Sequence, residues 1–283
     1  MRKIERDEIN SHLKNISKNG FTLIEEYLSI KEVDKALSIS KRYWDKSCKL
    51  EKEHAKGAKT VYGLETKEKF FLELVTNKPV KTVLMHFIND PYFRALPKEI
   101  PNYHIGYYLA RSSNNALLTH LDSYVPFKGD FPIIMQCLFA LEKQTLKNGC
   151  TYVVPGSHLS GKYPNQKIEY KTAINILSKP GDLVIWDSRI WHGARKNKTK
   201  ETRWALVATF MRHWIKARLD ATRNISKEYY AKLSGEEKAL LGFCSIPPHD
   251  LRKRITPRMS LEELYSNPDN FYYSLSSKIE NNK

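Results

Sequence analysis

The middle of the chain alternates between short apolar segments and turn sequences. The apolar segments are rich in β-branched and aromatic residues, and they cover 103–110, 131–141, 150–156, 173–178, 182–187 and 203–211. Turns such as Lys128-Gly129-Asp130 and Pro180-Gly181-Asp182 separate them. Many short strands without helices between them predict an antiparallel sheet that closes into a barrel or jelly roll.

Both ends of the chain predict helices instead. Ser29 and Glu32 form a Ser-x-x-Glu capping box, and apolar residues follow it at near-helical spacing. The stretch 67–89 predicts a second helical region, whereas 20–28 alternates like a short strand. Two more capping boxes follow Trp214; they pair Ser234 with Glu237 and Ser260 with Glu263.

These patterns predict a mainly β protein with flanking helices. No internal repeat, low-complexity linker or composition break divides the chain. We therefore expect one domain over 1–283, with helical support over 1–100, a jelly-roll core over 101–214 and a C-terminal helical lid or extension over 215–283.

Composition excludes several classes of protein. No run of 18 apolar residues exists in the sequence, so we expect no membrane span. The opening MRKIERDEIN is charged where a signal peptide needs an apolar run, which predicts a cytoplasmic protein. The four cysteines are dispersed without a CxxC pair, as expected of thiols in a reducing compartment.

The net charge of +16 raises the question of anionic partners. The lysines are scattered through every segment and form no long block, which favours a solvated surface. The chain also lacks the aromatic-and-basic signature of an RNA-binding sheet and any helix-turn-helix or zinc-finger spacing. We therefore expect a small-molecule partner rather than a nucleic acid.

Three residues form the donor set of a metal site. His120 and Asp122 stand two positions apart in LTHLDSY, so on an extended strand both side chains point to one face. His192 lies at the end of the predicted strand DLVIWDSRIWHG, which a jelly roll can return beside the first pair. Two histidines and a carboxylate are the facial triad that holds non-haem Fe(II) and leaves positions open for substrate and O2.

Arg203 follows His192 by eleven residues. The polar segment KNKTK at 196–200 predicts a hairpin turn between them, which would place the Arg203 strand beside the His192 strand. A guanidinium pairs with a carboxylate through two parallel charge-assisted hydrogen bonds. Arg203 is therefore the candidate for holding a dicarboxylate co-substrate.

The sequence resembles the phytanoyl-CoA dioxygenase-like family of Fe(II)/2-oxoglutarate oxygenases. The resemblance rests on three segments besides the triad: GFTLIEEYLS at 20–29, KNGCTYVVPGSHLSG at 147–161 and SKPGDLVIWDSRIWHGARKNKTKETRWAL at 178–206. It implies a double-stranded β-helix (cupin-like) core, His120, Asp122 and His192 as iron ligands, and Arg203 on the far carboxylate of 2-oxoglutarate. It also implies hydroxylation with release of succinate and CO2, because halogenating relatives replace the ligand carboxylate with a small residue.

Other residues are weaker candidates. Gln136 and Tyr107 lie on predicted strands, where they could hydrogen-bond the co-substrate. Arg111, Arg189 and Arg195 flank the ligand segments and could line an entrance for an anionic substrate. Four further residues are interpreted as structural: His104, His158, Trp191 and His213.

Two other functions compete with the oxygenase hypothesis. One is a cupin-type metal enzyme that does not use 2-oxoglutarate, and Arg203 argues against it. The other is a basic nucleic-acid-binding β protein, which a steep salt dependence of binding would favour. The motifs are specific for a family and not for a substrate, because variable loops build the pockets on a shared barrel.

Overall fold

The computed structural model describes residues 1–49, 52, 57–90 and 98–243, which form two compact units. Of these described residues, the first unit comprises those within 1–64 and 108–209, and the second comprises those within 65–107 and 210–243. The division of the chain into helical support, core and lid within one domain stays a prediction.

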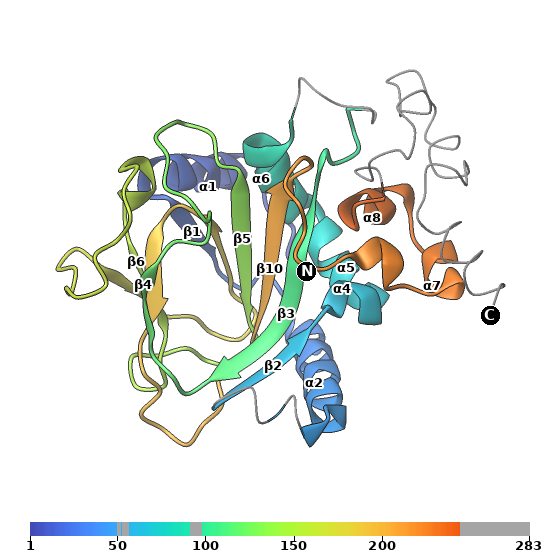
Figure 1. Cartoon of the computed structure of the whole chain (residues 1–283), viewed down its shortest axis with the longest axis horizontal. Coiled ribbons are helices and arrows are strands. Elements are labelled where there is room, and N and C mark those ends of the chain that lie inside the picture. Colours follow the sequence, from blue (N-terminus) through green and yellow to red (C-terminus); the bar gives the residue numbers. More distant parts are fainter. Residues whose placement is uncertain (50–51, 53–56, 91–97, 244–283) are drawn as a thin grey trace. The chain divides into compact units, whose positions relative to one another are not determined.

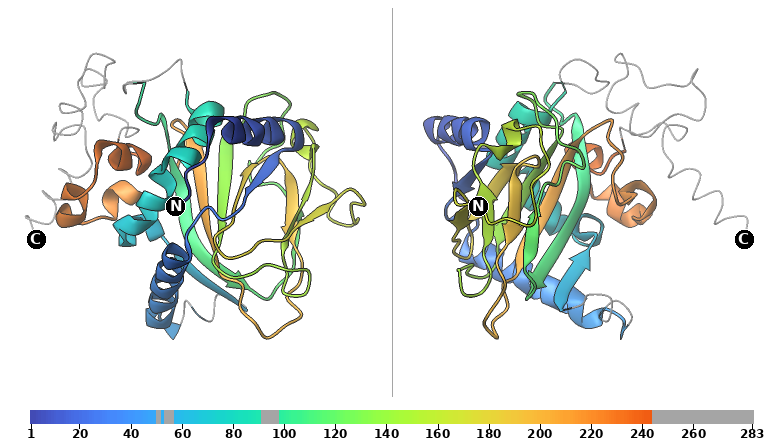
Figure 2. Two further views of the ribbon diagram at one scale, coloured as in Figure 1. Left: turned by 180° about the vertical axis from the view of Figure 1, so that it is seen from behind. Right: turned by 60° about the vertical axis from the view of Figure 1, so that its left-hand side comes forward.

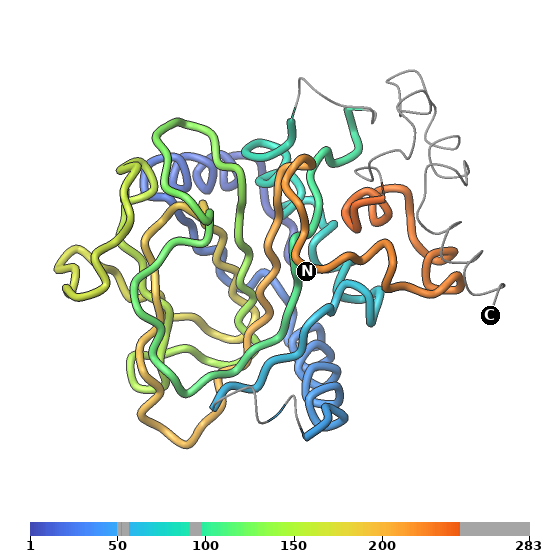
Figure 3. Tube along the Cα trace, in the orientation of Figure 1, coloured from blue at the N-terminus to red at the C-terminus, as the bar shows by residue number. Residues whose placement is uncertain are grey.

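Two antiparallel sheets dominate the described chain, as the alternating pattern predicts (Figures 1 and 3). The larger sheet has the strand order β1-β8-β5-β10-β3-β2, and the smaller has the order β4-β9-β6-β7. The larger sheet consists of β1 (Phe21–Ile24), β2 (Ala58–Tyr62), β3 (Tyr103–Ser113), β5 (Ile134–Ala140), β8 (Leu183–Asp187) and β10 (Ala205–Arg212). The smaller consists of β4 (Leu117–His120), β6 (Thr151–Val154), β7 (Ile174–Ile176) and β9 (Trp191–Ala194).

The hydrophobic core of the first unit fills the space between the two sheets. Its buried members come from both sheets and from the turn before β9; they are Leu138, Val153, Ile176, Val184, Trp186, Ile190 and Ala205. Successive side chains of a strand point to opposite faces, so the inward face of β5 carries Gln136 as well as Leu138. The same alternation places Ala205, Val207 and Thr209 on the inward face of β10.

Two helices flank the sheets of this unit (Figure 2). Helix α1 (Arg6–Asn19) packs against β1 and ends at Gly20, whose φ of 86° lets its N–H donate to the carbonyl of Ile16. Helix α2 (Ile30–Lys46) packs against β2. It begins at Ser29 with the predicted capping box to Glu32.

The second unit contains most of the remaining helices. The helical stretch predicted over 67–89 is divided into two helices, because Pro79 lies in the first turn of the second one and favours a new start there. The capping box of Ser234 with Glu237 is confirmed, and that of Ser260 with Glu263 lies outside the described residues. The elements are α4 (Leu64–Lys67), α5 (Lys69–Thr76), α6 (Lys78–Ile88), η2 (Ala221–Arg223), α7 (Lys227–Ala231) and α8 (Gly235–Leu240), and η1 (Ser157–Leu159) belongs to the first unit.

Two short strands that carry the candidate ligands differ from the prediction. DLVIWDSRIWHG is not one strand: β8 ends at Asp187, a turn follows, and β9 begins at Trp191. β4 ends at His120, so Asp122 lies in the turn beyond it and not on the strand. None of the helices in the described part of the chain combines the length and apolarity needed to cross a bilayer.

Candidate metal centre

His120 and His192 face each other across two neighbouring strands. They are register partners in the antiparallel pair β4–β9, and their ring centroids lie 4.2 Å apart. Asp122 reaches the same place from the turn after β4, where its backbone N–H donates to the carbonyl of Ser188 over 2.7 Å. The three predicted ligands therefore converge, although by strand pairing and a turn rather than by i, i+2 spacing on one strand.

The candidate ligand atoms of the three side chains, two imidazole nitrogens and the carboxylate oxygens, lie close together. The Nε2 of His120 lies 3.5 Å from Oδ1 of Asp122, and the Nε2 of His192 lies 3.2 Å from Oδ2. The candidate ligand atoms all lie within 4.8 Å of one another. Imidazole nitrogen and carboxylate oxygen suit a first-row divalent metal such as Fe(II), so the donor set fits the predicted iron.

The tautomers of both histidines are set by carbonyl groups. The Nδ1 of His120 lies 2.9 Å from the carbonyl of Leu118, and the Nδ1 of His192 lies 3.0 Å from that of Ile190. A carbonyl can only accept, so in each neutral ring Nδ1 carries the proton and Nε2 keeps its lone pair for the centre. Such outer contacts are typical of metal-binding histidines.

The electrostatics of the centre keep its carboxylate ionised. Burial alone would raise the pKa of Asp122, but the imidazoles of His192 and His120 outweigh that effect and hold this pKa well below its usual range. Burial alone would lower the pKa of His120, whereas its hydrogen bond and attraction to Asp122 raise it. A metal cation between these three groups would take the place of the imidazole protons, which otherwise attract the carboxylate of Asp122.

Gln136 lies against the candidate ligand Asp122, and its predicted contact with the co-substrate stays a prediction. Its Nε2 donates to Oδ2 of Asp122 over 2.7 Å. The hydroxyl of Thr209 donates to its Oε1 over 2.5 Å. Thr209 was not among the predicted site residues, although its place as an inward position on the strand that begins beyond Arg203 was a usable signal.

Arg203 lies in the first unit on the side of the larger sheet. It stands two residues before β10, continuing the inward alternation of Ala205 and Val207, and its Nε donates to the carbonyl of Ser113 over 3.1 Å. Burial first, and then the charge of Arg111, lower its pKa. The expectation that its strand lies beside the His192 strand is wrong: β10 runs between β5 and β3, while β9 belongs to the opposite sheet.

The three arginines proposed for an entrance have different surroundings. Arg111 is exposed on β3, and its positive charge contributes a lowering effect to the pKa of both His120 and Arg203. Arg189 is only 3% exposed, because its guanidinium binds Asp187 and the carbonyl of Gly129, so it does not line an entrance. Arg195 is bound to other side chains, with hydrogen bonds to Asn175 and Glu169.

The remaining candidates make contacts away from the three ligands. Tyr107 is half-buried in the second unit, where the guanidinium of Arg218 lies 5.0 Å from its ring centroid, and its role stays a prediction. Of the residues interpreted as structural, His158 lies 3.2 Å from the carbonyl of Ser17, and both ring nitrogens of His104 face carbonyls.

A hollow of about 500 Å³ opens beside His120. Tyr124 lines it with a φ of 65°, a left-handed backbone conformation that is costly for a non-glycine residue. Trp191 contacts residues on either side of the lining segment 163–167, because its Nε1 donates to the carbonyl of Lys162 and its ring packs on Tyr170. Besides His120 and Tyr124, the lining residues are Leu121, Tyr163, Pro164, Asn165, Gln166 and Lys167.

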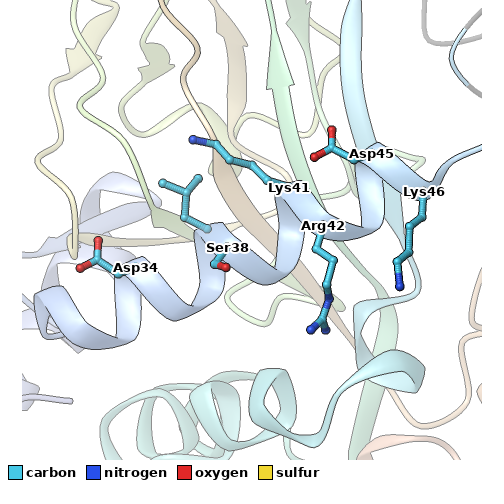
Figure 4. A pocket seen from close by; sticks show the side chains of 7 residues that line it. Asp34, Ser38, Lys41, Arg42, Asp45 and Lys46 are labelled. Carbon is cyan, nitrogen blue, oxygen red and sulfur yellow. The ribbon is translucent and has the colours of Figure 1, made fainter.

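A second hollow, of about 600 Å³, runs along α2 and does not compete with this site. Its lining residues come from one helix, and their side chains leave it in different directions (Figure 4). Acidic and basic groups are mixed there and point in different directions, so the hollow offers no shared point for a ligand.

Comparison with known proteins places the chain in a family. Residues 16–205 match the family described as phytanoyl-CoA dioxygenase (PhyH). An uncharacterized protein of Mycobacterium tuberculosis is 28% identical over 154 residues, which cover 52% of this chain and 53% of that protein. The matched region thus spans about half the length of this curated relative.

Solved structures share the fold at low identity. HygX from Streptomyces hygroscopicus, with nickel and 2-oxoglutarate bound, aligns with a TM-score of 0.58 at 14% identity, over 76% of this chain and 89% of that chain. SnoN, a non-haem α-ketoglutarate-dependent epimerase from nogalamycin biosynthesis, aligns with a TM-score of 0.55 at 17% identity, over 73% and 83%. The predicted jelly-roll fold is confirmed, and the chain belongs to the phytanoyl-CoA dioxygenase family.

Proposed function

We propose that the protein is an Fe(II)- and 2-oxoglutarate-dependent dioxygenase that hydroxylates a small molecule. The convergence of His120, Asp122 and His192, with both Nε2 lone pairs facing a carboxylate, carries the proposal. Family membership over residues 16–205 supports it independently. When bound, iron and 2-oxoglutarate supply oxidation by O2, in which one oxygen atom enters the substrate C–H bond, the other enters succinate, and CO2 is released.

The residues of the site have separate tasks in this proposal. The three ligands hold the metal on one face and leave the other positions to 2-oxoglutarate and O2. Arg203 binds the far carboxylate of 2-oxoglutarate, since its guanidinium is held inward by the carbonyl of Ser113. Retention of the Asp122 carboxylate favours hydroxylation, because its oxygen fills the position that a halide would need.

The hollow beside His120 is where we place the substrate. Tyr124 and Tyr163 offer aromatic surface there, and Lys167 offers a cation at its wall. Arg111 adds positive charge near His120. This chemistry favours an anionic small molecule with an apolar or ring-bearing body.

Turnover of 2-oxoglutarate tests the reaction class. Wild-type protein with Fe(II), ascorbate, O2 and 2-oxoglutarate should release succinate, and His192→Ala should release none. Iron-loaded, folded protein that forms no succinate would contradict the proposal and favour a cupin-type enzyme. Equal release by wild type and His192→Ala would also contradict it.

A substrate panel tests the anionic preference separately. Carboxylates and acyl thioesters of coenzyme A should stimulate succinate release, and amines of similar size should not. Stimulation by the amines alone would exclude an anionic substrate while leaving the dioxygenase activity intact.

A further inference from the structure

The metal-ligating carboxylate of Asp122 is held by a side-chain pair from the opposite sheet. Gln136 on β5 donates to Oδ2 of Asp122 over 2.7 Å, and Thr209 on β10 donates to Gln136. Each of these two supporting residues is 1% exposed. We propose that Gln136, fixed by Thr209, is a positioning residue that orients the Asp122 carboxylate for metal binding; this rests on the proposed function.

The hydrogen-bond directions in this pair are set by chemistry. An ionised carboxylate can only accept, so the amide NH2 of Gln136, and not its oxygen, must face Asp122. The amide oxygen then points to Thr209, whose hydroxyl can donate to it. Thr209 therefore stabilises the one amide orientation that supports an ionised ligand.

The backbone around Asp122 does not fix the carboxylate by itself. Asp122 lies in a turn, where its N–H bond to Ser188 sets the main chain but leaves the side-chain torsions free to vary. Gln136 and Thr209 lie on neighbouring strands of the larger sheet, which is a rigid support. A hydrogen bond from that support selects the carboxylate orientation in which Oδ1 faces His120 and Oδ2 faces His192.

The expected loss of metal affinity on removing Gln136 or Thr209 can be estimated from comparable contacts at other metal sites. Removing an outer partner of a metal ligand typically weakens metal affinity by about 10- to 100-fold. Thr209 acts through Gln136, so its loss should cost less than the loss of Gln136 itself. Neither change removes a ligand atom, so metal binding should be weakened and not abolished.

Titration calorimetry of the full-length, metal-free protein with Ni(II) measures this directly. Gln136→Leu keeps the side-chain size and removes both hydrogen bonds, and it should bind Ni(II) roughly 10- to 100-fold more weakly than wild type. Thr209→Val removes only the hydroxyl and should show a smaller loss, whereas Thr209→Ser keeps the donor and should bind like wild type. Cys137→Ala is the matched control, because Cys137 is the next residue on β5, fully buried and on the opposite face.

The outcomes separate a positioning role from general damage. Wild-type affinity in Gln136→Leu and Thr209→Val would overturn the inference, as would an equal loss in Cys137→Ala. If Gln136→Leu fails to fold, the comparison of Thr209→Val with Thr209→Ser still decides the matter, since wild-type affinity in both would overturn the inference. Wild-type protein that binds no Ni(II) would refute the metal centre, and thus the proposed function, before any variant is compared.

Discussion

Replacing Arg203 with methionine should lower the affinity for 2-oxoglutarate without lowering the stability of the ligand-free protein. The guanidinium is half-buried, lies near the charge of Arg111, and makes no ion pair with any residue that the structure describes. Its Nε is engaged by Ser113, which leaves its terminal nitrogens for an incoming carboxylate. A hydrogen bond to a charged group contributes about 1.5–3 kcal/mol, so we expect about a tenfold to a hundredfold loss of affinity.

Thermal unfolding in the presence of Ni(II) and increasing 2-oxoglutarate measures this loss. At a concentration of 100 times the wild-type Kd, 2-oxoglutarate should stabilise the wild type by about 2.7 kcal/mol. The same concentration should stabilise Arg203→Met by only about 0.4–1.4 kcal/mol, because the ratio of ligand to Kd falls to about 1–10.

The control for this prediction is Arg195→Met. Arg195 lies eight residues before Arg203 and is bound to Asn175 and Glu169, so its loss should leave the response to 2-oxoglutarate unchanged. An unchanged response in Arg203→Met would refute the reasoning and assign the far carboxylate to another residue. A reduced response in both variants would show an effect of net charge rather than of this contact.

Three more outcomes are expected. Asp122→Asn keeps the side-chain shape and should still unfold cooperatively in calorimetry without added metal, at a lower temperature than wild type because the attraction between the carboxylate and the imidazoles is lost, yet form no succinate. Undiminished succinate would remove Asp122 from the ligands. Gly193→Ala would place a Cβ 2.5 Å from the carbonyl of Leu117 and should destabilise the protein by about 1–3 kcal/mol in urea unfolding, whereas a neutral effect would show that β4 can move. Burial lowers the pKa of His158 below its ordinary 6.5, so the unfolded chain takes up a proton that the folded chain does not, and stability should fall as the pH drops below about 6.5. His158→Gln should flatten that slope in urea unfolding across this range, and an equally steep slope would assign the dependence to other groups.

The amino-acid sequence alone was enough to predict the strands that are long and apolar. β5 and β8 are buried along their whole length, so their apolar runs are unmistakable. β4 and β9 were missed as separate strands because each has four residues and carries polar ligands where apolar residues would mark a core strand. The three candidate ligands still converge as predicted from the sequence, because a turn after His120 brings Asp122 to the same point as an extended strand would.

Pairing between distant segments could not be predicted from one sequence. The turn over 196–200 suggested that the strands of His192 and Arg203 pair, yet each strand pairs within a different sheet. The partner of Gln136 also depends on which strands become neighbours. The burial of Arg189, in contrast, had a local signal: Asp187 precedes it by two residues and binds its guanidinium.

The central claim is that His120, Asp122 and His192 hold an iron to which 2-oxoglutarate binds. Anaerobic addition of Fe(II) and 2-oxoglutarate to the metal-free protein, followed by visible absorption spectroscopy, tests it most directly. We predict a charge-transfer band that requires both additions and is lost in His192→Ala. Folded protein that binds iron but shows no band, or a band that persists in His192→Ala, would contradict the claim.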